Sequence, residues 1–357
     1  MSIYDVVIIG AGVAGSNVGY LLGDDFEVLT IERSKELKLD SGIVSNKIFD
    51  LIRLPDNLIK LSISKMEFRS PSNKSFFFKS RRPFAYILKR LRFGKWLRNR
   101  LQKRSKIING EFLSLRHRSN YVEVRIRDQK IKAKVLVGAD GALSSVRNSL
   151  GILPPRIAFG VMMRGPKSKL KHPVVWFNKK YSNNFFAWFS PHNEYGLMDF
   201  GKIRERILNL STDLNLAPTD IYVRPIPIGV TKTYSKRVIL VGDAAGQVKP
   251  MTGGGIIFSL LGSKIATDVV REFLGTGDFT LFREYEKRWK RVLYNEIRVQ
   301  LLLRSMYSTI SNKKIDALFQ GLKLSNKYFN NFEYDRIITI LKEISIIDIL
   351  KLMVRLI

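Results

Sequence analysis

The chain has 357 residues, 45% of them hydrophobic, so it can bury a large core and is too apolar to be disordered. Lys and Arg number 61 against 31 Asp and Glu, and the net charge of +30 indicates a polyanionic partner: nucleic acid, an anionic membrane surface or a phosphorylated small molecule. There is no cysteine, which excludes disulfides and a thiol nucleophile, and the scattered histidines predict no metal site; redox chemistry would need a cofactor.

The predicted elements begin with a β-α-β unit: a strand over residues 4–9, a helix over 13–22 and a strand over 26–32. The turn GAGVAG between the first strand and the helix fits G-x-G-x-x-G. Gly10 permits a tight turn, Gly12 lets the backbone approach a pyrophosphate and Gly15 lets the helix pack closely. Glu32 ends the second strand, where a carboxylate can accept hydrogen bonds from ribose hydroxyls. The unit predicts a dinucleotide site.

The middle of the chain predicts a different kind of layer. Antiparallel strands are expected near residues 63–68 and 75–80, followed by a basic helix over 86–104 and a hairpin that leads into a buried strand before Gly138. From residue 157 to 224 aromatic residues dominate with strand-like spacing, as in VVWFNKKYSNNFFAWFSP. This region predicts a separate sheet that could enclose an apolar ligand, although an ordinary core has the same composition.

A second glycine-rich turn follows a second buried strand. In GDAAGQVKPMTGGGI, Gly242 and Asp243 suit a ribityl chain, and the glycines before Ile256 can bring backbone N–H groups to a phosphate or a flavin edge at a helix start. A nicotinamide enzyme needs no second turn of this kind in the same fold, whereas FAD does. Everything after Phe279 is expected to be helical.

Three motifs together, GAGVAG with Glu32, GADGALSSVR and GDAAGQVKPMTGGGI, resemble the FAD-dependent oxidoreductases of the aromatic-hydroxylase superfamily. Within it the chain is most similar to the geranylgeranyl reductase group, because of SGIVS, ILKRLRFGKWL and FAWFSP. The resemblance spans about residues 3–289. It implies an α/β fold with a Rossmann-like FAD-binding domain interleaved with an antiparallel-sheet substrate domain and a helical C-terminal region.

The resemblance also implies domain boundaries and the residues that contact FAD and substrate. Residues 1–75, 76–155 and 236–290 would form three FAD-binding parts, 156–235 the aromatic-rich substrate sheet and 291–357 the helical C-terminal region. The expected FAD contacts are Gly10, Gly12, Ala14, Gly15, Glu32, Arg33, Ser41, Gly42, Ile43, Arg90, Phe112, Asp140, Gly141, Gly242, Asp243, Gly254, Gly255 and Ile256. The expected substrate contacts are Trp176, Phe186, Trp188 and Pro250.

Two departures from the family pattern affect the expected chemistry. Many relatives have a cysteine where this chain has Asp40, which argues against a thiol mechanism, and they have aspartate where it has Gly94, which suggests that a contact stabilising the basic helix is absent. The implied activity is reduction of C=C bonds in geranylgeranyl chains by hydride from flavin N5, in membrane lipid biosynthesis. The catalytic residues are unknown; Lys249 and an ordered water are the candidate proton donors. The electron donor would be NAD(P)H or a ferredoxin.

Three alternatives share parts of this pattern. A flavin monooxygenase acting on an aromatic or lipid substrate would carry the same FAD motifs. A flavin halogenase is disfavoured because Trp-x-Trp-x-x-Pro is absent. A nucleic-acid-binding protein would gather its basic residues with surface aromatics on one face, whereas here they are spread along helices and loops; no nucleic acid partner is expected.

No apolar run reaches the length of about 18 residues that a transmembrane helix needs, and the N-terminus is unlike a signal peptide, so a cytoplasmic location is expected. Residues 334–357 carry Ile, Leu, Met and Val at helical spacing with few charges. They would form an amphipathic helix that either packs on the domain or lies in the inner face of the cell membrane, helped by Lys and Arg.

Overall fold

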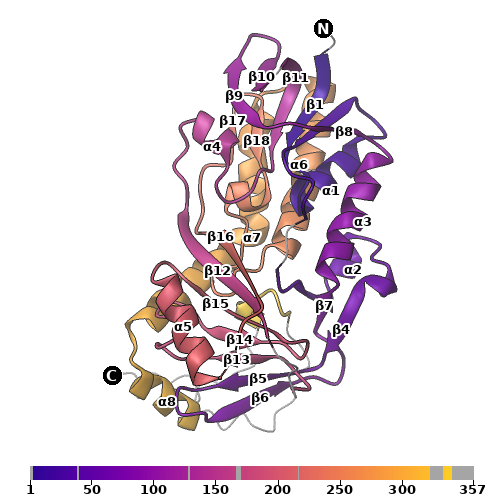
Figure 1. The fold of residues 1–357 in the computed structure, drawn as a ribbon. Helices are drawn as coiled ribbons and strands as arrows, with labels where there is room; N and C mark the ends of the chain where they lie inside the picture. Colours follow the sequence, from indigo (N-terminus) through magenta and orange to yellow (C-terminus); the bar gives the residue numbers. More distant parts are fainter. Residues whose placement is uncertain are drawn as a thin grey trace.

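Two lobes, each built around one large sheet, make up the computed structural model (Figure 1). The structure describes residues 3–37, 40–127, 129–165, 170–215, 217–321 and 333–339. The predicted fold class is confirmed, since the chain crosses between a parallel sheet flanked by helices and a mainly antiparallel sheet.

The upper lobe holds an eight-stranded sheet in the order β17-β18-β11-β1-β2-β8, with a β9-β10 hairpin attached to β11. Its strands are β1 (Ile3–Ile9), β2 (Val28–Glu32), β8 (Lys106–Asn109), β9 (Phe112–His117), β10 (Val122–Ile126), β11 (Gln129–Gly138), β17 (Tyr234–Ser235) and β18 (Val238–Leu240). The neighbours β18, β11, β1, β2 and β8 run parallel. Both faces are covered, so these strands are nearly continuous runs of Val, Ile and Leu.

Helices α1 (Val13–Leu22) and α6 (Ile256–Thr276) lie side by side against this sheet. The Asn17 amide donates a 2.7 Å hydrogen bond to the Ser263 hydroxyl between them. The remaining helices of this lobe are α2 (Ile48–Leu51), η1 (Asp56–Leu58), α3 (Arg90–Gln102), α4 (Ser145–Ser149), η2 (Gly242–Ala245) and the start of α7 (Thr280–Thr309). Two helix N-termini, those of α1 and α6, therefore begin near the same edge.

A seven-stranded sheet in the order β16-β12-β15-β14-β13-β5-β6 forms the lower lobe. Its strands are β5 (Lys65–Arg69), β6 (Ser75–Lys79), β12 (Arg156–Arg164), β13 (Val174–Trp176), β14 (Ala187–Phe189), β15 (Glu194–Asp199) and β16 (Asp220–Ile228). Helix α5 (Ile203–Asp213) covers one face, while the end of α7 and α8 (Asn312–Gly321) contact aromatic residues of the sheet.

Two local expectations need correction. Strands β5 and β6, which fall in or at the edge of the predicted FAD-binding parts, join the lower sheet because β5 pairs in parallel with β13. The predicted basic helix begins later than residue 86, because residues 85–88 form strand β7 (Ala85–Leu88) between β3 (Ile43–Ser45) and β4 (Ile59–Ile63) in a small three-stranded sheet.

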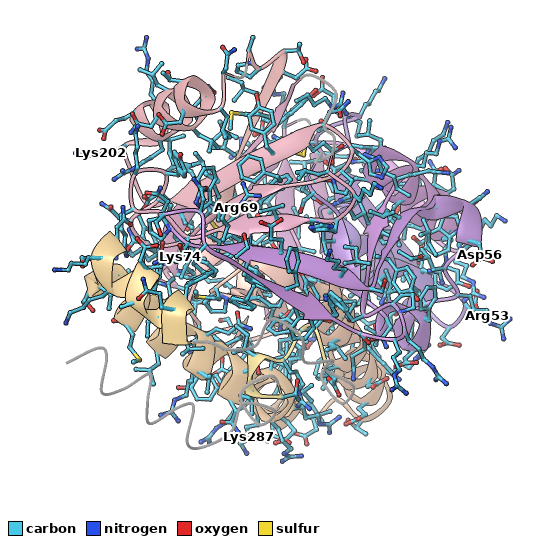
Figure 2. All side chains as sticks on the ribbon, turned by 90° about the horizontal axis from the view of Figure 1, so that it is seen from below. Arg53, Asp56, Arg69, Lys74, Lys202 and Lys287 are labelled. Atoms are coloured by element: carbon cyan, nitrogen blue, oxygen red, sulfur yellow. The ribbon has the colours of Figure 1, made fainter. Side chains whose placement is uncertain are left out.

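The C-terminal region is helical through α7 and α8, as expected. Of the predicted tail helix over 334–357, only residues up to 339 are described, and the rest lies outside the described residues. Among the helices that the structure describes, none combines the length and the apolar composition needed to cross a bilayer. Charged side chains project in many directions, and the labelled Arg53, Lys202 and Lys287 lie at widely separated points of the outline (Figure 2).

Candidate functional site

The two glycine-rich turns, more than two hundred residues apart in the sequence, meet in the structure. A Cβ atom built on Gly242 would lie 2.9 Å from the Cβ atom of Ala14, so the second turn touches the first turn of α1. The backbone at Gly242 is left-handed, with φ +68°, which favours glycine. The turns therefore form one site rather than two.

The three glycines of the first turn have different surroundings. A side chain on Gly10 would lie 2.4 Å from the carbonyl oxygen of Ala139, and one on Gly15 would lie 1.9 Å from the carbonyl oxygen of Gly10. Both positions exclude any larger residue. At Gly12, however, no heavy atom lies within 4 Å of the added Cβ, so the space in front of the helix N-terminus is open. Of the three glycines in this turn, only Gly12 therefore leaves room for a phosphate.

Glu32 fixes the first turn at the end of β2. Its Oε2 atom accepts a 2.6 Å hydrogen bond from the Ala11 N–H, and its Oε1 atom accepts one of 2.9 Å from the Ser34 N–H. Each carboxylate oxygen keeps acceptor capacity for a ribose hydroxyl. Arg33 is exposed beside it, while Phe112 is buried at the start of β9.

The middle motif, GADGALSSVR, ties the two turns together, a role that the sequence did not suggest. Asp140 accepts hydrogen bonds from the Ser144 hydroxyl and the Val146 N–H and thereby caps α4. The guanidinium of Arg147, 1% exposed, reaches across and donates to the carbonyl oxygen of Ala244 at 3.1 Å. Gly141 has φ +90°, which allows the chain to turn back toward the glycines.

The second turn leads to the N-terminus of α6. Gly255 precedes the helix without a side-chain cap, and the first turn of α6 has no acidic residue. A Cβ atom on Gly255 would lie 3.1 Å from Oδ1 of Asp243, so this carboxylate stands at the start of the helix. Gln247 stabilises the second turn, since its Oε1 atom accepts a 2.8 Å hydrogen bond from the Gly242 N–H.

The predicted flavin loop, Ser41 to Ile43, is held by a carboxylate. Asp40 accepts a 2.9 Å hydrogen bond from the Gly42 N–H, and Nε of Arg90 donates to both its oxygens at 2.9 and 2.8 Å. The departure at Gly94 leaves its Cβ position 3.6 Å from Nη1 of Arg90. Arg90 thus has a carboxylate partner after all, supplied by residue 40.

A buried ion pair lies behind the second turn. Nζ of Lys249 is 2.7 Å from Oδ1 of Asp335, and the two residues are 4% and 3% exposed. Burial alone would lower the pKa of Lys249, but the charges of Asp335, Tyr334 and Glu296 outweigh it and raise that pKa. Pro250 is buried next to this pair. The Lys249 ammonium is thus held by Asp335 in a buried structural ion pair.

Residues 333–339 are also linked to the second glycine-rich turn through side chains of α7. Gln300 of α7 accepts a 3.1 Å hydrogen bond from the Met251 N–H and donates one of 2.8 Å to Glu296. Oε1 of Glu296 accepts in turn from the Ile337 N–H at 2.7 Å. The C-terminal segment therefore forms a wall of the site.

Aromatic side chains cover the lower sheet on the face toward the second turn. Four half-buried rings form a row across neighbouring strands, with centroids 4.9 to 6.3 Å apart. This aromatic row consists of Phe76, Phe68, Phe177 and Phe186. The turn reaches the same face, because Gly253 lies against Met198, whose sulfur would be 3.1 Å from an added Cβ.

Of the predicted substrate residues in the lower sheet, Phe186 and Trp188 share one face and Trp176 lies on the other. Phe186 lies in the aromatic row, and Trp188 packs over Gly196 of the adjoining strand. Trp176 points to the opposite face, where it packs on Tyr181 and Phe189 under α5 and donates a hydrogen bond to the Ser70 carbonyl. For Trp176 the structure favours a core role, because side chains alternate along β13.

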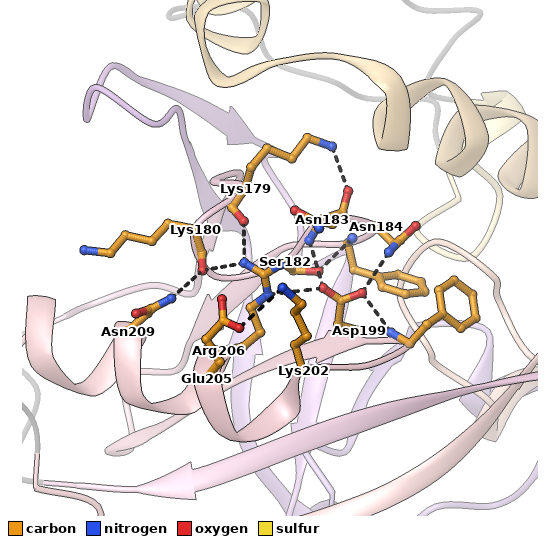
Figure 3. A network of polar contacts seen from close by, with 12 residues as sticks. Lys179, Lys180, Ser182, Asn183, Asn184, Asp199, Lys202, Glu205, Arg206 and Asn209 are labelled. Atoms are coloured by element: carbon orange, nitrogen blue, oxygen red, sulfur yellow. Dashed lines mark hydrogen bonds and ion pairs between the residues drawn. The ribbon is translucent and has the colours of Figure 1, made fainter.

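Buried Asp199 organises the loop before the aromatic strand β14 (Figure 3). Its carboxylate accepts 2.8 to 2.9 Å hydrogen bonds from the Asn183 N–H, the Asn184 amide and the Phe200 N–H. Arg206 of α5 lies 3.7 Å away and donates to the carbonyls of Lys179 and Lys180. This network fixes the backbone that precedes Phe186.

Lys179 in this loop makes stability depend on pH. Burial lowers the pKa of its ammonium from 10.5 to about 8, against the opposing charge of Asp199. Between these values the unfolded chain binds more protons, so the contribution of Lys179 to the free energy of unfolding rises with pH. We expect wild type to gain about 1 to 2 kcal/mol relative to Lys179→Met between about pH 8 and about pH 10.5, less than the full pKa shift would give because solvent screens this partly buried side chain.

Urea unfolding of both proteins at the two pH values measures this difference. Lys180→Met, at the exposed neighbouring lysine, is the matched control and should lack the differential gain. A difference between wild type and Lys179→Met that stays constant with pH would contradict the prediction.

These features fit FAD. Two helices whose own first turns contain no acidic residue begin at this site, and the first faces open space at Gly12. Glu32 and Asp243 supply carboxylates beside the two helix starts. Helix N-termini bind phosphates through free N–H groups and the positive end of the helix dipole. One extended dinucleotide would satisfy both, with its pyrophosphate at α1 and its flavin toward α6.

The solved structures agree with this class. A geranylgeranyl bacteriochlorophyll reductase-like protein from Thermoplasma acidophilum has a TM-score of 0.84 at 18% identity, covering 99% of this chain and 96% of that one. A halogenase solved in complex with FAD gives a TM-score of 0.70 at 14% identity, over 90% of this chain and 80% of its own. The chain thus shares its fold with these two proteins, one of which was solved with FAD, and this confirms the predicted fold class.

The relatives found by sequence include two reductases of geranylgeranyl compounds. No family model matches the chain. A digeranylgeranylglycerophospholipid reductase from Methanocaldococcus jannaschii is 27% identical over 358 residues, 90% of each chain. A geranylgeranyl diphosphate reductase from Rhodobacter capsulatus is 26% identical, covering 77% of this chain and 76% of its own. The predicted resemblance to the geranylgeranyl reductases is thereby confirmed.

Proposed function

We propose that the protein is an FAD-dependent reductase that saturates C=C bonds of isoprenoid chains in lipid biosynthesis. The observation that carries the proposal is the meeting of the two glycine turns beside the aromatic row. When bound, reduced FAD supplies a hydride for one alkene carbon. The named relatives, which are reductases of geranylgeranyl compounds, support the same chemistry.

The side chains have separate tasks in this proposal. The N–H groups at the start of α1 bind the pyrophosphate, and Glu32 and Asp243 orient the hydroxyl groups at either side. The aromatic row would pack against the isoprenoid chain. Since the ammonium of Lys249 is buried and paired with Asp335, we assign the proton for the second carbon to an ordered water.

The test is product analysis of the purified protein. After its visible spectrum has shown bound flavin, the protein is reduced under argon with NAD(P)H or with a reduced ferredoxin, which also identifies the electron donor. Incubation with geranylgeranyl lipids should then add two hydrogens per saturated bond by mass spectrometry. Addition of oxygen in air without saturation would instead identify the monooxygenase, and an unchanged lipid would contradict both.

We further propose that the protein works as a peripheral protein on an anionic membrane surface. The net charge of +30 and the apolar sequence of the C-terminal tail support this. A truncation that tests it must retain Asp335, because loss of that carboxylate would leave Lys249 buried and unpaired. Removal of residues 340–357 should therefore reduce cosedimentation with anionic vesicles while the flavin stays bound; unchanged vesicle binding would overturn the role of the tail.

A further inference from the structure

Two arginines from different elements converge on one aromatic ring beside the second turn. The Cζ atom of Arg156, at the start of β12, lies 3.7 Å from the centroid of the Phe200 ring. The Cζ atom of Arg304, on α7, lies 4.9 Å from the same centroid and 5.6 Å from that of Phe185. Like charges repel, and although Arg156 is exposed to solvent, the partly buried guanidinium of Arg304 requires compensation.

The described residues provide no such compensation. Within the described ranges, neither guanidinium forms an ion pair with a carboxylate, and Nε of Arg304 is buried without a hydrogen-bond acceptor. The nearby carboxylate of Asp199 is engaged by Asn183, Asn184 and its own loop. Burial and the charge of Arg156 both lower the pKa of Arg304, in keeping with two unneutralised cations facing one another.

The place of this pair relates it to the candidate site. Phe200 packs on a small cluster that includes Met198 and Ile226, and Gly253 of the second turn lies against both of these side chains. On the other side, Pro155 would lie 3.2 Å from a Cβ atom on Gly246, which ends the same turn. The arginines therefore flank the segment expected to hold the flavin.

The same sheet face carries the aromatic row. Phe186 precedes β14, which pairs with β15, so it lies beside Met198, and the row continues across β13 and β5 to Phe76 on β6. From β15 to β6 this spans about 19 Å at the usual strand spacing. The aromatic row, on which Tyr307 of α7 and Phe319 of α8 also pack, thus leads toward two guanidiniums. An apolar row with cations at one end is complementary to a long apolar chain with an anionic end.

We propose that Arg156 and Arg304 bind the phosphate or diphosphate end of an isoprenoid substrate whose chain lies along the aromatic row. The inference rests on the proposed function and specifies its substrate class. Guanidinium groups bind phosphate oxygens through paired, charge-assisted hydrogen bonds, and the ring of Phe200 holds both groups at one place. A phospholipid headgroup and a free diphosphate share this chemistry.

The test compares ligands that differ only in their polar end. The oxidised holoenzyme is titrated with geranylgeranyl diphosphate, a geranylgeranyl phospholipid and neutral geranylgeraniol, followed by the flavin spectrum. Arg156→Gln and Arg304→Gln should each weaken binding of a phosphorylated ligand by about 10- to 100-fold and leave geranylgeraniol within about twofold. The ligand that binds wild type more tightly identifies whether headgroup or free diphosphate is the natural source.

Two controls keep the result specific. Arg164→Gln alters an arginine on the same strand that also faces an aromatic ring, Tyr222, but has Asp220 as its partner, and it should change nothing. Because Arg304 also packs on Phe185, Arg304→Lys retains the charge and should lose less affinity than Arg304→Gln. Equal losses for charged and neutral ligands, or no loss for either arginine, would overturn the proposal.

A titration with inorganic pyrophosphate separates this proposal from the function itself. Calorimetric binding that depends on Arg156 and Arg304, without any alkene reduction, would support the anion site and contradict the reductase. Alkene reduction, together with pyrophosphate binding that stays unchanged when either arginine is replaced, would support the reductase and contradict the anion site.

Discussion

Replacement of Gly12 by aspartate should abolish FAD binding while the fold remains intact. The space at Gly12 is open, and its φ of −74° suits any residue, so the side chain costs the fold little. A carboxylate before α1 even improves the helix N-terminus, but it occupies the place of a pyrophosphate and repels it. We expect FAD affinity to fall at least about 100-fold, or roughly 3 kcal/mol, with Tm of the apoprotein unchanged or higher.

Fluorescence titration of the apoprotein with FAD and thermal unfolding measure the two effects. Gly275→Asp is a matched control, because it adds the same carboxylate to open space at the far end of α6. Gly15→Ala makes the converse test: its Cβ would lie 1.9 Å from a carbonyl oxygen, so both binding and stability should be lost. If Gly12→Asp binds FAD as wild type does, the assigned pyrophosphate position is wrong.

Replacement of Lys249 by methionine should destabilise the protein by about 3 to 5 kcal/mol, because it leaves the carboxylate of Asp335 buried without a cation. Oδ2 of Asp335 already lacks a hydrogen-bond partner among the described residues, so the remaining charge has little compensation. In the double variant Lys249→Met/Asp335→Leu, both charges are gone and most of the lost stability should return.

Urea unfolding of the single and double variants gives this comparison. Arg271→Met removes one partner of an exposed pair with Asp25, so that it should cost less than about 1 kcal/mol. Additive losses in the double variant would mean that Lys249 and Asp335 act independently. Bound flavin should also be lost more readily from Lys249→Met, since segment 333–339 contacts the second turn through this pair.

Local sequence patterns were sufficient to predict the two turns. Gly10, Gly12 and Gly15 act within one strand-turn-helix unit, and Glu32 is brought to them by the next parallel strand. The role of such residues follows from spacing alone. The dinucleotide site could therefore be predicted from local pattern, whereas the interleaved FAD-type fold was implied by the resemblance of three motifs to a known superfamily.

Contacts between distant segments could not be predicted in this way. The Arg147 side chain meets Ala244 and Lys249 meets Asp335 only because the fold brings their elements together. The orientation of Trp176 is a different case. Its strand is apolar on both faces, so alternation gave no indication of which side chains point toward the second turn.

The pairing of β5 with β13 and the position of Asp335 have a consequence for synthesis on the ribosome. The lower sheet cannot close until more than a hundred residues after β5 have emerged, and Lys249 meets its counterion only when nearly the whole chain has been made. Such long-range contacts slow folding. A prematurely terminated chain would therefore expose an unneutralised lysine and an incomplete cofactor site. These two features distinguish unfinished from finished molecules for cellular quality control.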